Sequence, residues 1–282
     1  MDGLQKEIMS TLGVTKEFDA EQEARRRIDF LETYLEQSRL RSYVLGISGG
    51  VDSLTAALLA QQAVRELRET GYDASFVAVR LPYGPQADET DAAKAIEIIG
   101  ADRVLTVNIK PSTDAAFESL RASGLNFTDA AQEDFIRGNI KARQRMITQY
   151  AIAGVLHGLV IGTDHAAEAL MGFFTKFGDG ASDVVPLSGL NKRRVRAIAI
   201  AMRAPADLVA KVPTADLEDN APLRPDEQAY GVIYDEIDDF LEGKKISEQS
   251  RARILGTYSG SAHKRALPVG PADDTAFSRA RI

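Results

Sequence analysis

The sequence predicts an α/β protein in which a parallel sheet is flanked by helices on both faces. Short runs rich in β-branched and other apolar residues alternate with longer segments of helical periodicity along the first part of the chain. Strands that alternate with helices in this way form right-handed β-α-β units, so the strands lie parallel and helices cover both faces. A glycine-rich segment directly follows the first apolar run, where such sheets bind ligands.

The expected elements follow from periodicity and from the position of the turn residues. A first helix is expected in a segment where four apolar side chains share one face, namely Ile28, Leu31, Tyr34 and Leu35. Strands are expected at 43–48, 74–81, 103–109 and 158–163. Later helices are expected at about 54–69, 87–100, 130–157, 226–241 and 247–258. Residues 211–228, rich in proline and acidic residues, are expected to form a long loop.

Composition narrows the classes of function. The chain has 282 residues, a formal net charge of −7 and no cysteine. Disulfides, cysteine-ligated metals and a thiol nucleophile are therefore excluded. The acidic balance argues against a general nucleic-acid-binding face. The longest apolar run, 150–162, is too short to span a bilayer and contains His157. We therefore expect a cytoplasmic protein with no nucleic-acid or membrane partner.

The glycine-rich segment GISGGVDS, residues 46–53, allows two interpretations. It lacks the lysine of the P-loop that usually binds phosphates. A structural interpretation makes Gly49 and Gly50 a strand-to-helix turn and Asp52 a helix cap. A functional interpretation places the free N–H groups of the helix start on an oxyanion. Asp52 beside phosphates then requires a cation such as Mg2+. Because the segment follows the first strand of a β-α-β unit, we favour the functional interpretation.

The helical segment FIRGNIKARQRM places an arginine among apolar residues. Arg143 lies on the same stripe as Ile140 and Ile147. An arginine in that position either has a partner or a ligand, or it packs with its stem and reaches water with its guanidinium group. The pattern alone leaves both interpretations open.

The segment GTDHAAEALMGFFTKFGDG, residues 162–180, also has two interpretations. Thr163 and Asp164 are expected to cap a helix, and Glu168 lies about one turn into it. The helix dipole favours an acid there whatever its function, but Glu168 also suits a Mg2+ ligand opposite Asp52. Phe173 is expected either in the core or stacked on a flat ring.

A basic triplet lies near the end of the chain, in the segment SAHKRALP. It consists of His263, Lys264 and Arg265. Such a triplet forms either a solvated face or a site for a phosphate group, because clustered cations hold phosphate oxygens by charge-assisted hydrogen bonds.

Together these motifs resemble one enzyme family. SGGVDS resembles the loop of the N-type ATP pyrophosphatases, which cleave ATP between the α- and β-phosphates. GNIKAR, GTDHAAEA, FFTKFGDG, PTADL and YDEIDDFLEG follow in the order found in ammonia-dependent NAD synthetases. The resemblance implies an adenine nucleotide alpha hydrolase-like, Rossmann-like fold. It also implies ATP-dependent amidation of deamido-NAD by ammonia, which yields NAD, AMP and pyrophosphate through an NAD-adenylate intermediate.

The resemblance also implies a role for individual residues. ATP would be bound by Gly46, Ile47, Ser48, Gly49, Gly50, Val51, Asp52, Ser53, Thr163, Lys192 and Thr214. Mg2+ would be held by Asp52 and Glu168. The dinucleotide would contact Phe135, Arg143, Phe173, Lys176, Asp183, His263 and Lys264. The catalytic residues would be Asp179, which positions or deprotonates the incoming ammonium, and Lys192, which neutralises phosphate charge.

The same resemblance sets expectations for organisation and partners. We expect residues 1–282 to form a single NAD synthetase domain without a glutaminase domain, because no cysteine is present to release ammonia from glutamine. The partners expected are deamido-NAD, ATP and ammonia. A homodimer is expected as well, because the apolar faces of the helix at 130–157 look too wide for one sheet to cover.

Two other classes of function remain open from sequence. One is a different ligase of the pyrophosphatase group or a tRNA-modifying enzyme, although the latter usually needs cysteines or a basic face. The other is a nucleotide-binding regulatory module without turnover. Release of pyrophosphate from ATP, with and without deamido-NAD, distinguishes all three.

Overall fold

A parallel four-stranded sheet forms the centre of the computed structural model, which describes residues 2–84, 89–215, 217, 220 and 224–271. The strand order is β3-β2-β1-β4. The strands are β1 (Ser42–Gly46), β2 (Ser75–Arg80), β3 (Arg103–Thr106) and β4 (Gly158–Val160). Beyond β4, a parallel bridge from Ile161 to Val184 continues the sheet edge. The predicted parallel sheet is confirmed.

Thirteen helices and a small hairpin surround this sheet in the part of the chain that the structure describes. The helices of the first half are α1 (Gly3–Thr11), α2 (Ala20–Ser38), α3 (Val51–Glu69), α4 (Glu89–Ile99), α5 (Lys110–Ala122) and α6 (Ala130–Val155). Those of the second half are α7 (Ala166–Met171), α8 (Lys192–Ala201), α9 (Ala206–Val209), α10 (Asp226–Tyr230), α11 (Tyr234–Leu241), α12 (Glu248–Gly260) and α13 (Ala262–Arg265). The hairpin pairs β5 (Thr214–Ala215) with β6 (Arg224–Pro225).

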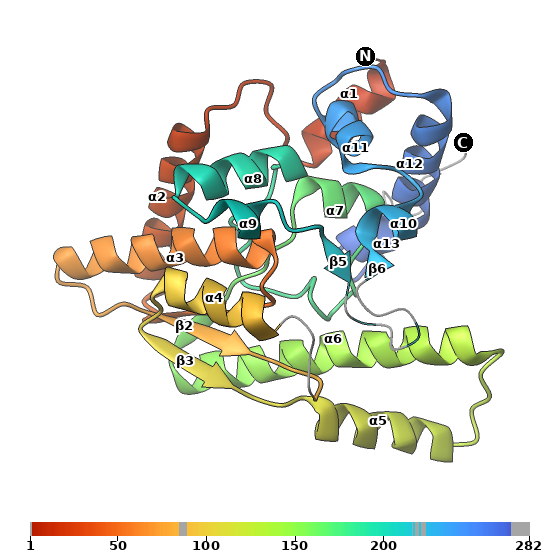
Figure 1. Cartoon of the computed structure of the whole chain (residues 1–282), viewed down its shortest axis with the longest axis horizontal. Coiled ribbons are helices and arrows are strands. Elements are labelled where there is room, and N and C mark those ends of the chain that lie inside the picture. Colours follow the sequence, from red (N-terminus) through yellow and green to blue (C-terminus); the bar gives the residue numbers. More distant parts are fainter. Residues whose placement is uncertain (1, 85–88, 216, 218–219, 221–223, 272–282) are drawn as a thin grey trace.

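Helices cover the sheet on both faces, as predicted (Figure 1). α2, α3 and α8 pack on one face, where Leu45 and Phe76 join a large apolar core. α6 packs on the other face against Val44 and Val77, with α5 outside it. Neighbouring strand residues such as Val44 and Leu45 point to opposite faces, so a strand buried on both sides must be apolar throughout.

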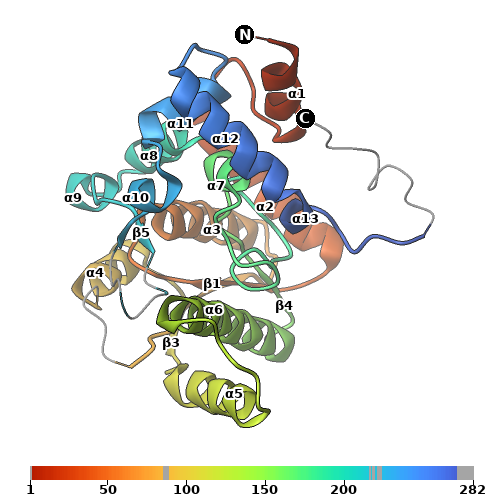
Figure 2. The ribbon, with the colours of Figure 1, turned by 90° about the vertical axis from the view of Figure 1, so that its right-hand side faces the viewer.

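A second cluster of helices lies beside the sheet domain (Figure 2). α1, α7, α10, α11 and α12 share a core of Ile8, Leu170, Ile237, Phe240 and Ile254. α7 begins shortly after β4, so this cluster stands next to the carboxyl edge of the sheet. No helix in the described residues is both long and apolar enough to cross a membrane.

Several expected elements differ from the structure. β3 ends at Thr106 rather than at 109, because the chain turns into α5, a helix that periodicity had not indicated. Tyr34 is 39% exposed and packs on Phe30 instead of joining the buried stripe. The helix expected at 226–241 is broken at Gly231, whose φ of +69° lies in the left-handed region. Residues 211–228, expected as a loop, contain the hairpin and the start of α10.

Candidate active site

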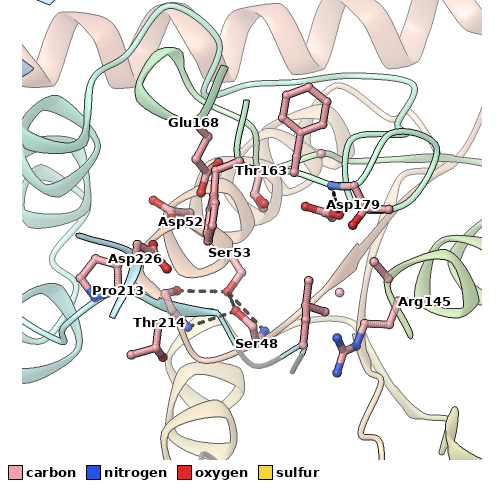
Figure 3. A pocket seen from close by; sticks show the side chains of 18 of the residues that line it. Ser48, Asp52, Ser53, Arg145, Thr163, Glu168, Asp179, Pro213, Thr214 and Asp226 are labelled. Atoms are coloured by element: carbon pink, nitrogen blue, oxygen red, sulfur yellow. Dashed lines mark hydrogen bonds between the residues drawn. The ribbon is translucent and has the colours of Figure 1, made fainter. Parts of the chain in front are cut away.

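A cavity of about 430 Å³ opens at the carboxyl edge of the sheet. Its walls come from the ends of β1 and β4, from α6 and α7, from the first turn of α8 and from the segment around Thr214. The sequence-predicted site residues that line it are Gly46, Ile47, Ser48, Gly50, Val51, Asp52, Ser53, Phe135, Thr163, Glu168, Phe173, Asp179, Lys192, Thr214 and Lys264. Figure 3 shows Asp52, Glu168 and Asp226 on one side of the cavity, with Asp179 and Arg145 on the other.

The glycine-rich loop is held in shape by its own polar groups. Ser53 Oγ donates to the carbonyl of Gly50 at 3.1 Å and lies 3.2 Å from Ser48 Oγ. Gly49 has a φ of +83°, and a Cβ there would lie 2.9 Å from the backbone nitrogen of Ala92, so only glycine fits. Gly49 therefore supports the loop from behind and does not line the cavity.

Helix α3 begins directly after this loop. Gly50 is its N-cap and offers no side-chain acceptor, so the first N–H groups have no capping side chain. Asp52 does not act as the cap, which rules out the structural interpretation of that residue. Its Oδ2 instead accepts a hydrogen bond from Lys192 Nζ at 2.6 Å. The uncapped helix start at the cavity suits an oxyanion.

Lys192 is the counter-ion of a buried group of acids. Its side chain is only 1% exposed and reaches Asp52 from the first position of α8. Burial acts to raise the pKa of Asp52, but the basic groups around it, with Lys192 the foremost, together outweigh burial and lower that pKa. Burial and the charge of Asp52 raise the pKa of Glu168 well above its ordinary value. Asp226 is a further acid of this group, and burial raises its pKa too.

Two carboxylate oxygens of this group lack a hydrogen-bond partner among the described residues. Asp52 Oδ1 is buried and accepts no hydrogen bond from any described residue, and Asp226 Oδ1 is in the same situation. A buried carboxylate without a partner is costly unless a cation compensates it. Ligand atoms of Asp52, His165 and Glu168 lie within 4.8 Å of one another. The oxygens of the two acids suit a hard divalent cation.

Sequence reasoning missed Asp226, and it also missed His165, the histidine of this group. It caps α7, the role predicted for Thr163 and Asp164: its Nδ1 accepts the N–H of Glu168 at 3.4 Å. Its Nε2 lies 3.6 Å from an oxygen of Asp52 and of Glu168, and 3.5 Å from Lys192 Nζ. Burial lowers the pKa of His165 to about 3, so the ring is neutral. It thus lies among the acids and Lys192 as a neutral ring. The signal in the sequence that could have identified His165 was its position directly before the predicted helix, where a capping residue is expected.

The opposite wall carries an acid in a different setting. Asp179 Oδ1 accepts the N–H of Thr175 at 2.9 Å, and burial raises the pKa of Asp179. Arg145 lies on α6 and donates from Nε to the carbonyl of Leu81 at 3.2 Å. Phe173 packs edge-on against Tyr230, with ring centroids 4.7 Å apart. Sequence reasoning missed Arg145, although it lies two positions from the arginine it selected.

Four predicted substrate residues do not line the cavity. Arg143 donates to the carbonyl of Lys176 at 3.2 Å, and Lys176 Nζ donates to the carbonyl of His263 at 2.6 Å. These three residues, of which Arg143 and His263 are exposed and Lys176 is half-buried, form one group outside the cavity, the rim cluster. Asp183 lies apart from them, and its Oδ2 accepts the N–H of Val160 at 2.7 Å. Ile147 is 52% exposed, so the apolar stripe that includes Arg143 is not buried within a single chain.

The basic triplet holds the end of α7 in this structure. Lys264 Nζ donates to the carbonyls of Gly172 and Phe174, both at 2.9 Å. Arg265 donates to the carbonyl of Ala169 at 3.0 Å. Cations near a helix C-terminus satisfy carbonyls that have no partner within the helix. Of the triplet, only Lys264 also lines the cavity.

Comparison with known proteins places the chain in a family. The family model described as NAD synthase matches residues 23–268. An NH(3)-dependent NAD(+) synthetase of Burkholderia cenocepacia is 61% identical over 94% of both chains. A crystal structure of NAD+ synthetase from Burkholderia pseudomallei superposes with a TM-score of 0.82 at 56% identity, covering 94% of this chain and 97% of that one. An NMN synthetase structure from Francisella tularensis gives 0.78 at 35% identity, covering 91% and 100%. The chain therefore belongs to the NAD synthase family.

Proposed function

We propose that this chain is an ammonia-dependent NAD+ synthetase. It amidates deamido-NAD with ammonia at the expense of ATP and gives NAD, AMP and pyrophosphate through an NAD-adenylate intermediate. The observation that carries the proposal is the lysine-free glycine loop, which lines the same cavity as the ion pair of Asp52 and Lys192. The chain that carries this cavity belongs to the NAD synthase family.

The chemistry requires ATP because ammonia does not displace oxide from a carboxylate. The carboxylate on the pyridine ring attacks the α-phosphorus of ATP, and pyrophosphate leaves. Ammonia then attacks the acyl carbon of the adenylate, and AMP leaves with the bonding electrons. The first step depends on positioning and on neutralising phosphate charge rather than on a covalent enzyme intermediate.

The loop and Lys192 supply the positioning for that step. Residues 46–53 place the uncapped start of α3 on the phosphates, while Thr163 and Thr214 line the same cavity. Lys192 lies at the junction of the loop and the acid group, where its ammonium can turn from Asp52 to a phosphate oxygen. Charge neutralisation there favours the departing pyrophosphate.

Asp52 and Glu168 would hold Mg2+. The fit rests on the oxygen of Asp52 that lacks a hydrogen-bond partner among the described residues, and on the close approach of Asp52 and Glu168, whose ligand atoms lie within 4.8 Å of each other. When bound, the ion neutralises phosphate charge that the acids would otherwise repel. His165 then lies beside both carboxylates as a neutral ring and adds no charge to the site.

The opposite wall would receive the pyridine ring and ammonia. Phe135 and Phe173 offer flat faces at the cavity, and Asp179 provides a carboxylate beside them. Burial, together with Asp179, raises the pKa of Asp164 to about 7. Asp179 positions the incoming ammonium and takes up its proton, which leaves the lone pair of ammonia free to attack.

A homodimer would complete the dinucleotide site. The rim cluster can contact the dinucleotide only if another surface covers it. Beside the cluster, α6 has an apolar face that includes the exposed Ile147 and Val155. Asp183 would contact the same part of the substrate. We further propose that residues 1–282 form one synthetase domain that acts in the cytoplasm.

Purified protein with ATP, Mg2+, deamido-NAD and ammonium tests the proposal. We expect NAD and pyrophosphate to form in equal amounts, and no NAD to form when ammonium is replaced by ammonia-free glutamine. Nicotinate mononucleotide is offered in a parallel reaction, because a relative is an NMN synthetase. Faster amidation of the mononucleotide would reassign the substrate. Pyrophosphate release at the same rate with and without deamido-NAD or the mononucleotide would overturn the synthetase function.

A further inference from the structure

The segment YDEIDDFL forms α11, which packs against the start of α8. Its Asp238 is 2% exposed and lies between these two helices. Asp238 Oδ1 accepts the N–H of Lys192 at 3.0 Å, and Oδ2 accepts the N–H of Arg193 at 2.7 Å. Both oxygens of a single carboxylate are therefore bound to consecutive backbone groups of another helix.

These bonds cap α8 from outside its own sequence. The first N–H groups of a helix have no partner within the helix and need an external acceptor. The N-cap residue Asn191 satisfies only the N–H of Arg194, at 2.9 Å, which leaves those of Lys192 and Arg193 to Asp238. A carboxylate at this end of a helix is also favoured by the helix dipole.

The same helix contacts the other end of Lys192. The ammonium group of Lys192 lies 5.1 Å from the centroid of the Tyr234 ring, within range of a cation–π interaction. The Tyr234 hydroxyl donates to Asp226 Oδ2 at 3.0 Å, so the ring is fixed in turn. α11 therefore contacts Lys192 at both ends: Asp238 holds its backbone N–H, and the Tyr234 ring lies beside its ammonium group.

We propose that Asp238 is a positioning residue that sets the place of the Lys192 ammonium group in the reaction. This inference rests on the proposed role of Lys192 at the ATP phosphates. Lys192 is the first residue of α8, the part of a helix that frays most easily. A small displacement of a charge-neutralising group costs much of its effect on rate.

Asp238→Asn tests the inference, with Asp239→Asn as the matched control. Asparagine keeps one acceptor but turns an NH2 donor toward a backbone N–H, so the first turn of α8 must shift. Asp239 is the next residue of α11, and its carboxylate accepts hydrogen bonds from the side chains of Arg193 and Lys244, at 3.1 and 3.0 Å. We expect kcat for pyrophosphate release to fall about 10- to 100-fold in Asp238→Asn. KM for deamido-NAD should stay unchanged, and Asp239→Asn should match wild type.

A double-mutant cycle with Lys192→Met separates positioning from a general structural effect. If Asp238 acts through Lys192, Asp238→Asn lowers kcat no further in a chain that already lacks the ammonium group. Full additivity of the two losses would overturn the inference.

Labelling of Lys192 by an amine-reactive reagent, followed by peptide mass spectrometry, gives a readout that needs no activity. We expect faster labelling in Asp238→Asn than in wild type and in Asp239→Asn, and equal labelling would count against positioning. If Lys192 is labelled more slowly in wild type than in Asp238→Asn but wild type makes no NAD, the proposed function fails while the inference on position stands. If Asp238→Asn does not fold, Asp238→Glu replaces it, and wild-type kcat and labelling there would overturn the inference.

Discussion

The two walls of the cavity are built in opposite ways. The charged wall, made of Asp52, His165, Glu168, Lys192 and Asp226, is largely buried. Within it Lys192 pairs with Asp52, and His165 lies 3.6 Å from an oxygen of Asp52 and of Glu168. The α6 wall, which includes Phe135 and Arg145, is more open: Phe135 is 55% exposed, and the rim cluster beside it faces solvent.

The difference indicates a division of labour. Groups that stabilise developing charge act best when they are fixed in advance and shielded from water. Groups that recognise a large substrate can be completed by another surface, at little cost to the stability of the single chain. We therefore expect substitutions on the charged wall to lower kcat and those on the α6 side to raise KM.

The largest effect is expected from the acids of the charged wall. Asp52→Asn and Glu168→Gln should each lower pyrophosphate release about 100- to 1000-fold, because each removes a negative ligand for the cation. The rate is measured over a range of Mg2+ concentrations, with Asp29→Asn, an exposed ion-pair acid, as the control. Near-normal rates in either variant at ordinary Mg2+ would remove the shared cation site.

The next effect should come from the loop that supports this wall. Gly49→Ala introduces a Cβ 2.9 Å from the Ala92 nitrogen at a φ of +83°, so the loop must move away from the phosphates. We expect KM for ATP to rise at least about tenfold. Gly124→Ala is a matched control, because Gly124 has the same φ of +83° with nothing within 4 Å. Both variants should lose about 1 kcal/mol of stability from backbone strain. An equal rise in KM for ATP in both variants would mean that backbone strain, rather than displacement of the loop by Ala92, changes KM.

The rim cluster gives a smaller effect that depends on assembly. Arg143→Gln should raise KM for deamido-NAD about tenfold while leaving KM for ATP unchanged, because a dimer would bring Arg143 to the substrate. Arg41→Gln, at an exposed ion pair with Asp73, should change neither constant. Sedimentation at assay concentration should show a dimer. A fully active monomer would refute the interface and would show that the rim cluster is not part of the substrate site.

The smallest effect concerns stability and pH. The pKa of Asp164 is raised to about 7 from 3.8, chiefly by burial. The folded chain therefore keeps a proton that the unfolded chain releases, so stability falls as pH rises from about 4 and the loss is complete above about 7. Asp164→Asn should be free of this loss and gain on the order of 2 kcal/mol over wild type at pH 8. Denaturant unfolding at pH 5 and pH 8 measures it. An equal difference at both pH values would contradict the assignment.

Local sequence by itself determined the architecture and the family. The alternation of apolar runs with helical periodicity predicted a parallel sheet covered on both faces, because each signal lies within one element. The segment at residues 46–53 predicted a loop for an oxyanion from its glycines and from its position after a strand, and that role stays a prediction. Motifs in family order were sufficient to identify the family that the comparisons show.

Only the tertiary structure decided how the charges meet. Lys192 and Asp52 pair across 140 positions, and Asp238 caps a helix 46 positions earlier in the chain. His165 took the capping role expected of its two neighbours, and four predicted substrate residues came to lie outside the cavity. Periodicity reports which face of an element is buried, but not which element will lie against it. Pairs of charges, caps supplied by other helices and the rim of a cavity depend on that packing, so they follow from the fold alone.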